Sequence, residues 1–160
     1  MVWLYALILL LLAAALLGAY RVLGTPSRLT PRDYDVVLAD IKTSVERAAG
    51  RLRRALEGGP AGPLEDEATA ARKIFQTGYY QTLRLRPSSG PDLAADARAE
   101  LGRACEAYDW ASRMLGSESV HNPLVLEAAR RLLGAGDTAL KQVELELPPV
   151  RDTPRGNTAP

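Results

Sequence analysis

The chain has 160 residues, a net charge of +1, one cysteine and one histidine. A net charge so close to zero argues against a dedicated nucleic-acid binder, which needs a strongly basic surface. One cysteine excludes an intramolecular disulfide, which fits a reducing compartment without excluding an oxidising one.

The first predicted element is an apolar run from Val2 to Tyr20, 19 residues without a charged side chain. As a helix it would be about 28 Å long, which matches the hydrocarbon thickness of a bilayer. Trp3 and Tyr5 lie near one end and Tyr20 at the other, where aromatic rings favour the membrane interface. We therefore expect residues 1–23 to form a transmembrane anchor. A buried core helix and a cleaved signal peptide are the alternatives, although no basic residue precedes the run as a signal peptide requires.

Positive charge follows the apolar run rather than preceding it. Arg21, Arg28 and Arg32 lie within a dozen residues of its end, whereas no Lys or Arg comes before it. The positive-inside rule then places the soluble part in the cytoplasm, at the cell membrane, with the N-terminus outside. We expect these three arginines to contact lipid headgroups and residues 24–29 to form a juxtamembrane linker. Small residues in the anchor would also allow self-association with a second copy.

Four amphipathic helices are predicted in the remaining chain, because apolar residues recur there at steps of three and four. The predicted spans are 30–57, 64–86, 91–115 and 122–147. Thr30 and Asn122 are expected N-caps, each followed by a proline at the first helical position. No strand-like alternation is long enough to form a sheet. The expected fold is therefore all-α: one transmembrane helix followed by an antiparallel four-helix bundle over 30–147, with a disordered tail over 148–160.

The helical periodicity also predicts which side chains form the core. The expected apolar lines, one for each helix, are Leu38, Ile41, Val45, Ala48, Leu52 and Ala55; Ala68, Ala71, Phe75, Gly78 or Tyr79, and Leu83; Leu93 or Ala94, Ala97, Leu101, Ala104 or Cys105, Tyr108, Ala111 and Leu115; and Leu126, Ala129, Leu133, Gly136, Leu140, Val143 and Leu147.

No motif for catalysis or metal binding withstands inspection. Glu118 and His121 have the Glu-x-x-His spacing of di-iron bundles, but such sites need two copies and this chain has one histidine. The acidic residues of 96–109 alternate with arginines, which is typical of a solvated, salt-bridged face. The GGPAGP segment lacks the lysine of a phosphate-binding loop. We therefore expect no catalytic residue, metal or cofactor.

Tyr80 and Trp110 are the residues we expect to contact a partner, because they lie beside the core lines and an exposed aromatic is a plausible binding anchor. The leading hypothesis is a non-enzymatic, single-pass membrane protein whose helical domain binds an unidentified protein as an accessory or scaffold subunit. The alternative is an extracytoplasmic, membrane-tethered helical sensor or ligand-binding domain. A metal-dependent bundle enzyme is a third class.

Overall fold

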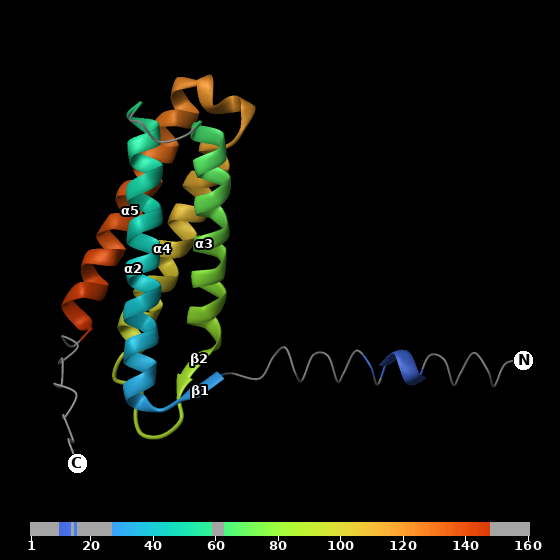
Figure 1. The fold of residues 1–160 in the computed structure, drawn as a ribbon, viewed down its shortest axis with the longest axis vertical. Helices are drawn as coiled ribbons and strands as arrows, with labels where there is room; N and C mark the ends of the chain where they lie inside the picture. The colour runs from blue at the N-terminus through green and yellow to red at the C-terminus, as the bar shows by residue number, and fades with distance from the viewer. Residues whose placement is uncertain (1–9, 14, 16–26, 59–62, 148–160) are drawn as a thin grey trace, which may run out of the picture.

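Four long helices dominate the structure, a computed structural model that describes residues 10–13, 15, 27–58 and 63–147. In chain order the elements are β1 (Ser27–Leu29), α2 (Pro31–Leu56), α3 (Leu64–Arg84), β2 (Leu85–Pro87), α4 (Ala95–Leu115), the short 3-10 helix η1 (Glu118–His121) and α5 (Pro123–Glu146). Consecutive long helices run in opposite directions, so that α2 begins and α5 ends at the end of the bundle that carries β1 and β2 (Figure 1). The helical bundle expected from the sequence is confirmed.

Two helices begin at the positions that we predicted from their N-capping residues. The Thr30 hydroxyl oxygen accepts a hydrogen bond from the Asp33 amide at 3.3 Å, and the Asn122 side chain accepts one from the Leu124 amide at 3.0 Å. α4 begins at Ala95 rather than at 91, so the prediction for its start was wrong. The reason is that both carboxylate oxygens of Asp92 accept hydrogen bonds from other side chains, in the network described below, and the segment before α4 is a turn.

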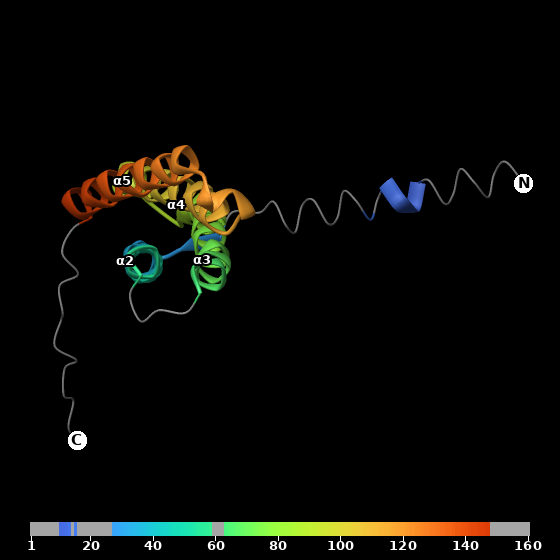
Figure 2. The ribbon, with the colours of Figure 1, turned by 90° about the horizontal axis from the view of Figure 1, so that it is seen from above.

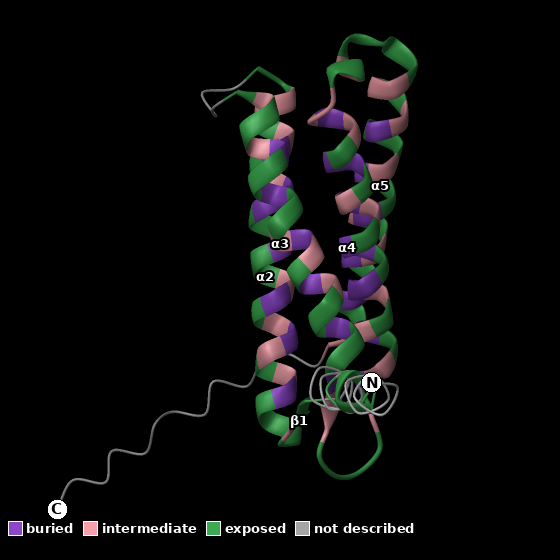
Figure 3. Ribbon diagram, turned by 90° about the vertical axis from the view of Figure 1, so that its right-hand side faces the viewer, coloured by how far each residue is buried: buried purple, intermediate pink, exposed green. Residues whose placement is uncertain are grey.

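The bundle has two layers, α2 with α3 and α4 with α5 (Figures 2 and 3). Buried side chains lie on the facing sides of the helices, and they include most of the predicted core lines. One predicted core residue, Leu83, is 52% exposed instead, and of the alternatives Leu93 and Ala94 it is Ala94 that is buried. Thr82 takes the buried position at the end of α3, because the alternating steps through Phe75 and Gly78 lead to residue 82. Tyr34 at the start of α2 is buried and was not predicted.

Glycines let α4 approach both of its neighbours closely. A Cβ atom at Gly136 of α5 would lie 2.5 Å from Cε1 of Tyr108, and one at Gly78 of α3 would lie 3.0 Å from Sγ of Cys105. The fully buried Tyr108 ring also stacks on Phe75 with 5.1 Å between ring centroids. Tyr108 therefore connects α3, α4 and α5 at the centre of the core.

A short parallel strand pair closes one end of the bundle, although the sequence predicted no sheet. β1 and β2 pair with Ser27 opposite Leu85, Arg28 opposite Arg86 and Leu29 opposite Pro87. The Ser88 amide continues the pairing by donating to the Leu29 carbonyl at 2.7 Å. Strands of three residues are too short to show a period-two pattern, which explains the wrong prediction. The last three residues of the expected 24–29 linker are thus hydrogen-bonded to the segment that follows α3.

Within the part of the chain that the structure describes, no helix combines the length and apolar character needed to cross a bilayer. Most of the apolar run, including Trp3, Tyr5 and Tyr20, lies outside the described residues. Arg21 and the expected tail over 148–160 lie outside them as well.

Candidate functional site

Tyr80 and Trp110, the two expected contact residues, line one hollow between α3 and α4, which we call the aromatic hollow. Tyr80 is 63% exposed and Trp110 is 50% exposed, although they come from different helices. The hollow has a volume of about 190 Å³. Its lining residues are Gln76, Tyr79, Tyr80, Glu106, Asp109, Trp110 and Arg113. The structure therefore brings the two predicted residues together on one surface.

Neighbouring side chains hold the aromatic rings of the hollow in place. The rings of Tyr79 and Tyr80 meet edge to face, with 5.9 Å between their centroids. The Arg113 guanidinium lies 4.9 Å from the centre of the Trp110 ring, a cation–π contact. Arg113 Nε also donates to Asp109 Oδ2, one helical turn earlier in α4, at 2.9 Å. These contacts reduce the conformational entropy that the rings would lose on binding.

Asp109 lines the hollow, and one of its two carboxylate oxygens has no hydrogen-bond partner among the described residues. Its Oδ1 atom is buried and accepts no hydrogen bond from the described residues. Arg72 forms an ion pair with this oxygen, with its Nε atom 3.6 Å away. The hollow therefore combines exposed aromatic surface with the paired charges of Asp109 and Arg113, and such aromatic and arginine groups are typical of protein-binding surfaces.

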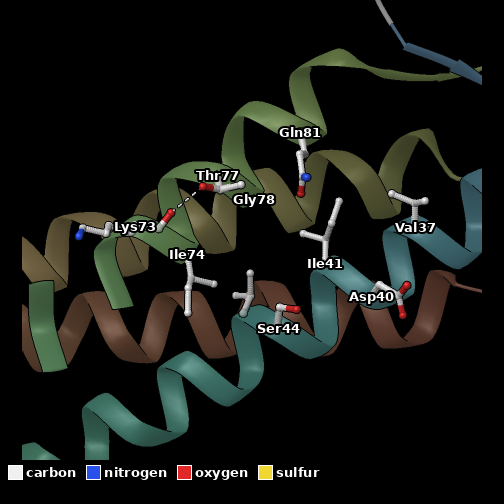
Figure 4. A pocket seen from close by; sticks show the side chains of 10 residues that line it. Val37, Asp40, Ile41, Ser44, Lys73, Ile74, Thr77, Gly78 and Gln81 are labelled. Carbon is white, nitrogen blue, oxygen red and sulfur yellow. Dashed lines mark hydrogen bonds between the residues drawn. The ribbon is translucent and has the colours of Figure 1, made fainter. Parts of the chain in front are cut away.

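A larger groove runs between α2 and α3, on the other side of α3 (Figure 4). Its volume is about 520 Å³. Ile41 extends from α2 toward α3, and Ile74 extends from α3 toward α2. The lining residues are Val37, Asp40, Ile41, Ser44, Val45, Lys73, Ile74, Thr77, Gly78 and Gln81. The sequence did not predict this groove, because it arises from the spacing between two helices.

α2 and α5 are joined by polar groups rather than by an extensive apolar contact. The Tyr108 hydroxyl donates to Asp137 Oδ1 at 2.6 Å, and Arg53 of α2 pairs with the same carboxylate oxygen. Burial raises the pKa of Tyr108 to about 12, although the nearby Arg53 charge opposes that shift. Two clefts of about 360 Å³ each include Arg53 and Asp137 in their linings. These groups fix α2 against α5 over the buried tyrosine.

A second polar network ties the start of α2 to α4. The Tyr34 hydroxyl donates to Asp92 Oδ1 at 3.0 Å and accepts from Arg98 Nε at 2.9 Å. Arg98 also donates to Asp92 Oδ2 at 3.1 Å and to the Thr82 carbonyl at 3.2 Å. The sequence did not predict this network, because its members are far apart in the chain. It holds the end of the bundle to which β1 is attached.

The remaining candidates are placed as follows. Arg28 lies in β1 and Arg32 in the first turn of α2, and both are exposed. Glu118 and His121 lie in η1, and among the described residues no group of three His, Cys, Asp or Glu side chains is arranged to hold a metal ion. Cys105 is buried, and burial raises the pKa of its thiol to about 12.

Comparison of the chain with protein-family models, with curated proteins and with solved structures finds no match.

Proposed function

We propose that this chain is a non-enzymatic, single-pass membrane protein whose helical domain binds a protein partner through the aromatic hollow. The observation that carries the proposal is the shared position of Tyr80 and Trp110. Aromatic residues and arginine are enriched at the centres of protein interfaces, where a few of them supply most of the binding energy. Here two exposed rings and the stacked Arg113 lie on one surface.

The proposed membrane anchor is residues 1–23. Ten of the 19 residues in the apolar run are Leu, Ile or Val, which favours insertion by roughly 3 to 6 kcal/mol. Leu10, Leu11 and Leu12 are helical and exposed, as lipid-facing side chains would be. An anchor confines the bundle to the membrane and raises its effective concentration for a partner there. This is the mechanism we propose for an accessory or scaffold subunit.

The experiment that tests the proposal is a quantitative pull-down of the tagged full-length chain from its native membrane in mild detergent. We expect a near-stoichiometric partner that is lost from the Tyr80→Ala/Trp110→Ala double variant. Leu124→Ala is the matched control, because Leu124 is an exposed apolar residue of α5, outside the hollow. Recovery of the chain alone, or equal recovery of the partner with the double variant, would contradict the proposal.

We propose that the bundle faces the cytoplasm, on the basis of Arg21, Arg28 and Arg32. Leu93→Cys tests this orientation, because position 93 is 90% exposed whereas the native Cys105 is buried. A membrane-impermeant maleimide should label the variant only after cell lysis. Labelling in intact cells would place the bundle outside and support the extracytoplasmic alternative.

The α2–α3 groove favours one second candidate, an extracytoplasmic ligand-binding or sensor domain. Its volume of about 520 Å³ lies within the range of roughly 300–1,000 Å³ for small-molecule sites. Its apolar centre, formed by Ile41, Val45 and Ile74, has polar groups such as Asp40 and Lys73 in the same lining. Native mass spectrometry of the full-length chain tests this candidate. A small molecule that is retained by the wild type and lost from Ile74→Glu would support it.

A further inference from the structure

The strand pair at the end of the bundle places two arginines side by side. Partners in a parallel pair point their side chains to the same face, and Arg28 is opposite Arg86. Leu85 is buried, and Leu29 is partly buried and packed against the core. Successive side chains of a strand point to opposite faces, so Arg86, next to Leu85, and Arg28, next to Leu29, point away from the core. Arg28 and Arg86 therefore both lie on the outer face of the strand pair.

This pairing is unfavourable by itself. Neighbouring strands lie about 4.8 Å apart, and like charges placed directly opposite each other destabilise a strand pair. Among the residues that the structure describes, neither arginine forms an ion pair with a carboxylate, although nine other such pairs are present. The two arginines thus occupy paired strand positions, and no carboxylate among the described residues pairs with either charge.

Arg86 is also fixed in position. Its Nη1 atom donates to the Leu85 carbonyl at 2.6 Å and to the Thr82 carbonyl at 3.5 Å, at the end of α3. Within the described part of the chain, its Nε and Nη2 atoms make no hydrogen bond, and they remain as donors for a ligand. One arm of the guanidinium therefore fixes the side chain while the other N–H groups are free to bind.

We propose that Arg28 and Arg86 bind the phosphate group of an anionic ligand on the outer face of the strand pair. Two guanidinium groups offer planar N–H donors that match phosphate oxygens, and the anion would offset their mutual repulsion. The site lies at the end of the bundle where the chain enters from the apolar run, so an anionic lipid headgroup is the favoured source. That source, but not the phosphate chemistry, rests on the proposed membrane attachment.

The test is hydrogen exchange of the full-length chain in nanodiscs, read at the backbone amides of residues 27–29 and 85–88. Nanodiscs of phosphatidylglycerol are compared with nanodiscs of zwitterionic phosphatidylcholine, and inorganic phosphate is added to the second set as a separate arm. In the wild type, phosphatidylglycerol should slow exchange of these amides about tenfold, equivalent to about 1.4 kcal/mol.

Arg28→Gln should differ from the wild type both without and with the anionic lipid. Without an anionic lipid its amides should exchange more slowly than those of the wild type, because the repulsion is gone. With phosphatidylglycerol they should gain no protection. Arg86→Gln should lose the same response, and Arg28→Gln keeps the test valid if loss of the contacts to α3 unfolds that variant. Arg84→Gln is the matched control, because Arg84 is an exposed arginine at the end of α3, directly before β2, and this variant should respond as the wild type does.

An equal loss of protection in Arg84→Gln would overturn the proposal, because it would indicate diffuse attraction rather than a site. No response of the wild type to either phosphatidylglycerol or inorganic phosphate would overturn it as well. Protection by inorganic phosphate alone would keep the site and exclude the lipid as its source. Failure of the chain to enter nanodiscs would contradict the proposed anchor, while the phosphate arm would still test the arginine pair in detergent.

Discussion

Gly136→Ala should destabilise the bundle even though alanine is the better helix former. Gly136 lies within α5, and the methyl group of an alanine there would lie 2.5, 2.6 and 2.8 Å from three atoms of the Tyr108 ring. The ring cannot move away easily, because it is fully buried, stacks on Phe75 and donates a hydrogen bond to Asp137.

Two opposing terms determine the size of the effect. Replacing glycine by alanine inside a helix stabilises it by about 1 kcal/mol. Inserting a methyl group into a packed core costs about 1–3 kcal/mol. All three distances are well below ordinary van der Waals contact, so the cost should fall at the upper end of that range. The expected net loss is therefore about 1–2 kcal/mol, or a melting temperature lower by about 2–8 °C for a chain of this length.

Gly134→Ala is the matched control, because it makes the same change two residues away in the same helix. Nothing lies within 4 Å of a Cβ atom at Gly134. Only the helix-propensity gain of about 0.5–1 kcal/mol should remain, and that variant should melt at a higher temperature than the wild type. The assay is thermal unfolding of the full-length chain in detergent, followed by circular dichroism. A Gly136→Ala variant as stable as Gly134→Ala would refute the close packing of α4 against α5.

Three further predictions concern the buried Cys105 and Tyr108 and the half-buried Arg98. Burial raises the pKa of Cys105 to about 12, so its thiol should react with a disulfide reagent near about pH 8 only after unfolding; rapid labelling of the native chain would contradict this. The pKa of Tyr108 is raised by burial from 10.0 to about 12, so the neutral form stabilises the fold fully below pH 10, and that contribution is lost as the pH rises to about 12. The free energy of unfolding, measured with urea, should fall as the pH rises through that window, and it should fall less steeply with pH for Tyr108→Phe. An equal dependence on pH in the wild type and the variant would contradict this prediction. Arg98→Ala removes the donors to Tyr34, Asp92 and the Thr82 carbonyl and should cost about 1–3 kcal/mol in the same assay, whereas Arg131→Ala, which loses only an exposed pair with Glu127, should change stability by less than about 1 kcal/mol.

Local signals in the sequence were sufficient for the helices and two of their starts. Thr30 and Asn122 cap α2 and α5 because their side chains reach amides two or three residues ahead. The strand pair could not be predicted, because three-residue strands show no pattern and their pairing depends on how α3 returns to the start of α2. The start of α4 was missed for a related reason, since Asp92 bonds to side chains from two separate elements.

The candidate site, too, could be predicted only in part from the sequence. The helical period placed Tyr80 and Trp110 beside the core lines, and both are exposed. Their common hollow depends on how α3 and α4 pair, which one sequence does not reveal. Arg86 was missed as a neighbour of Arg28 because α2 and α3 separate the two in the chain and only the strand register joins them.

The most direct test of the proposed function is site-specific photocrosslinking in native membranes. Benzoylphenylalanine at Gln76 lies in the lining of the aromatic hollow and leaves Tyr80 and Trp110 intact. The same group at Leu124 serves as the control on a different exposed surface. We predict one dominant adduct with a second protein from position 76, absent from position 124 and lost when Trp110→Ala is added. Adducts of equal yield from both positions, or none from position 76, would contradict partner binding at this surface.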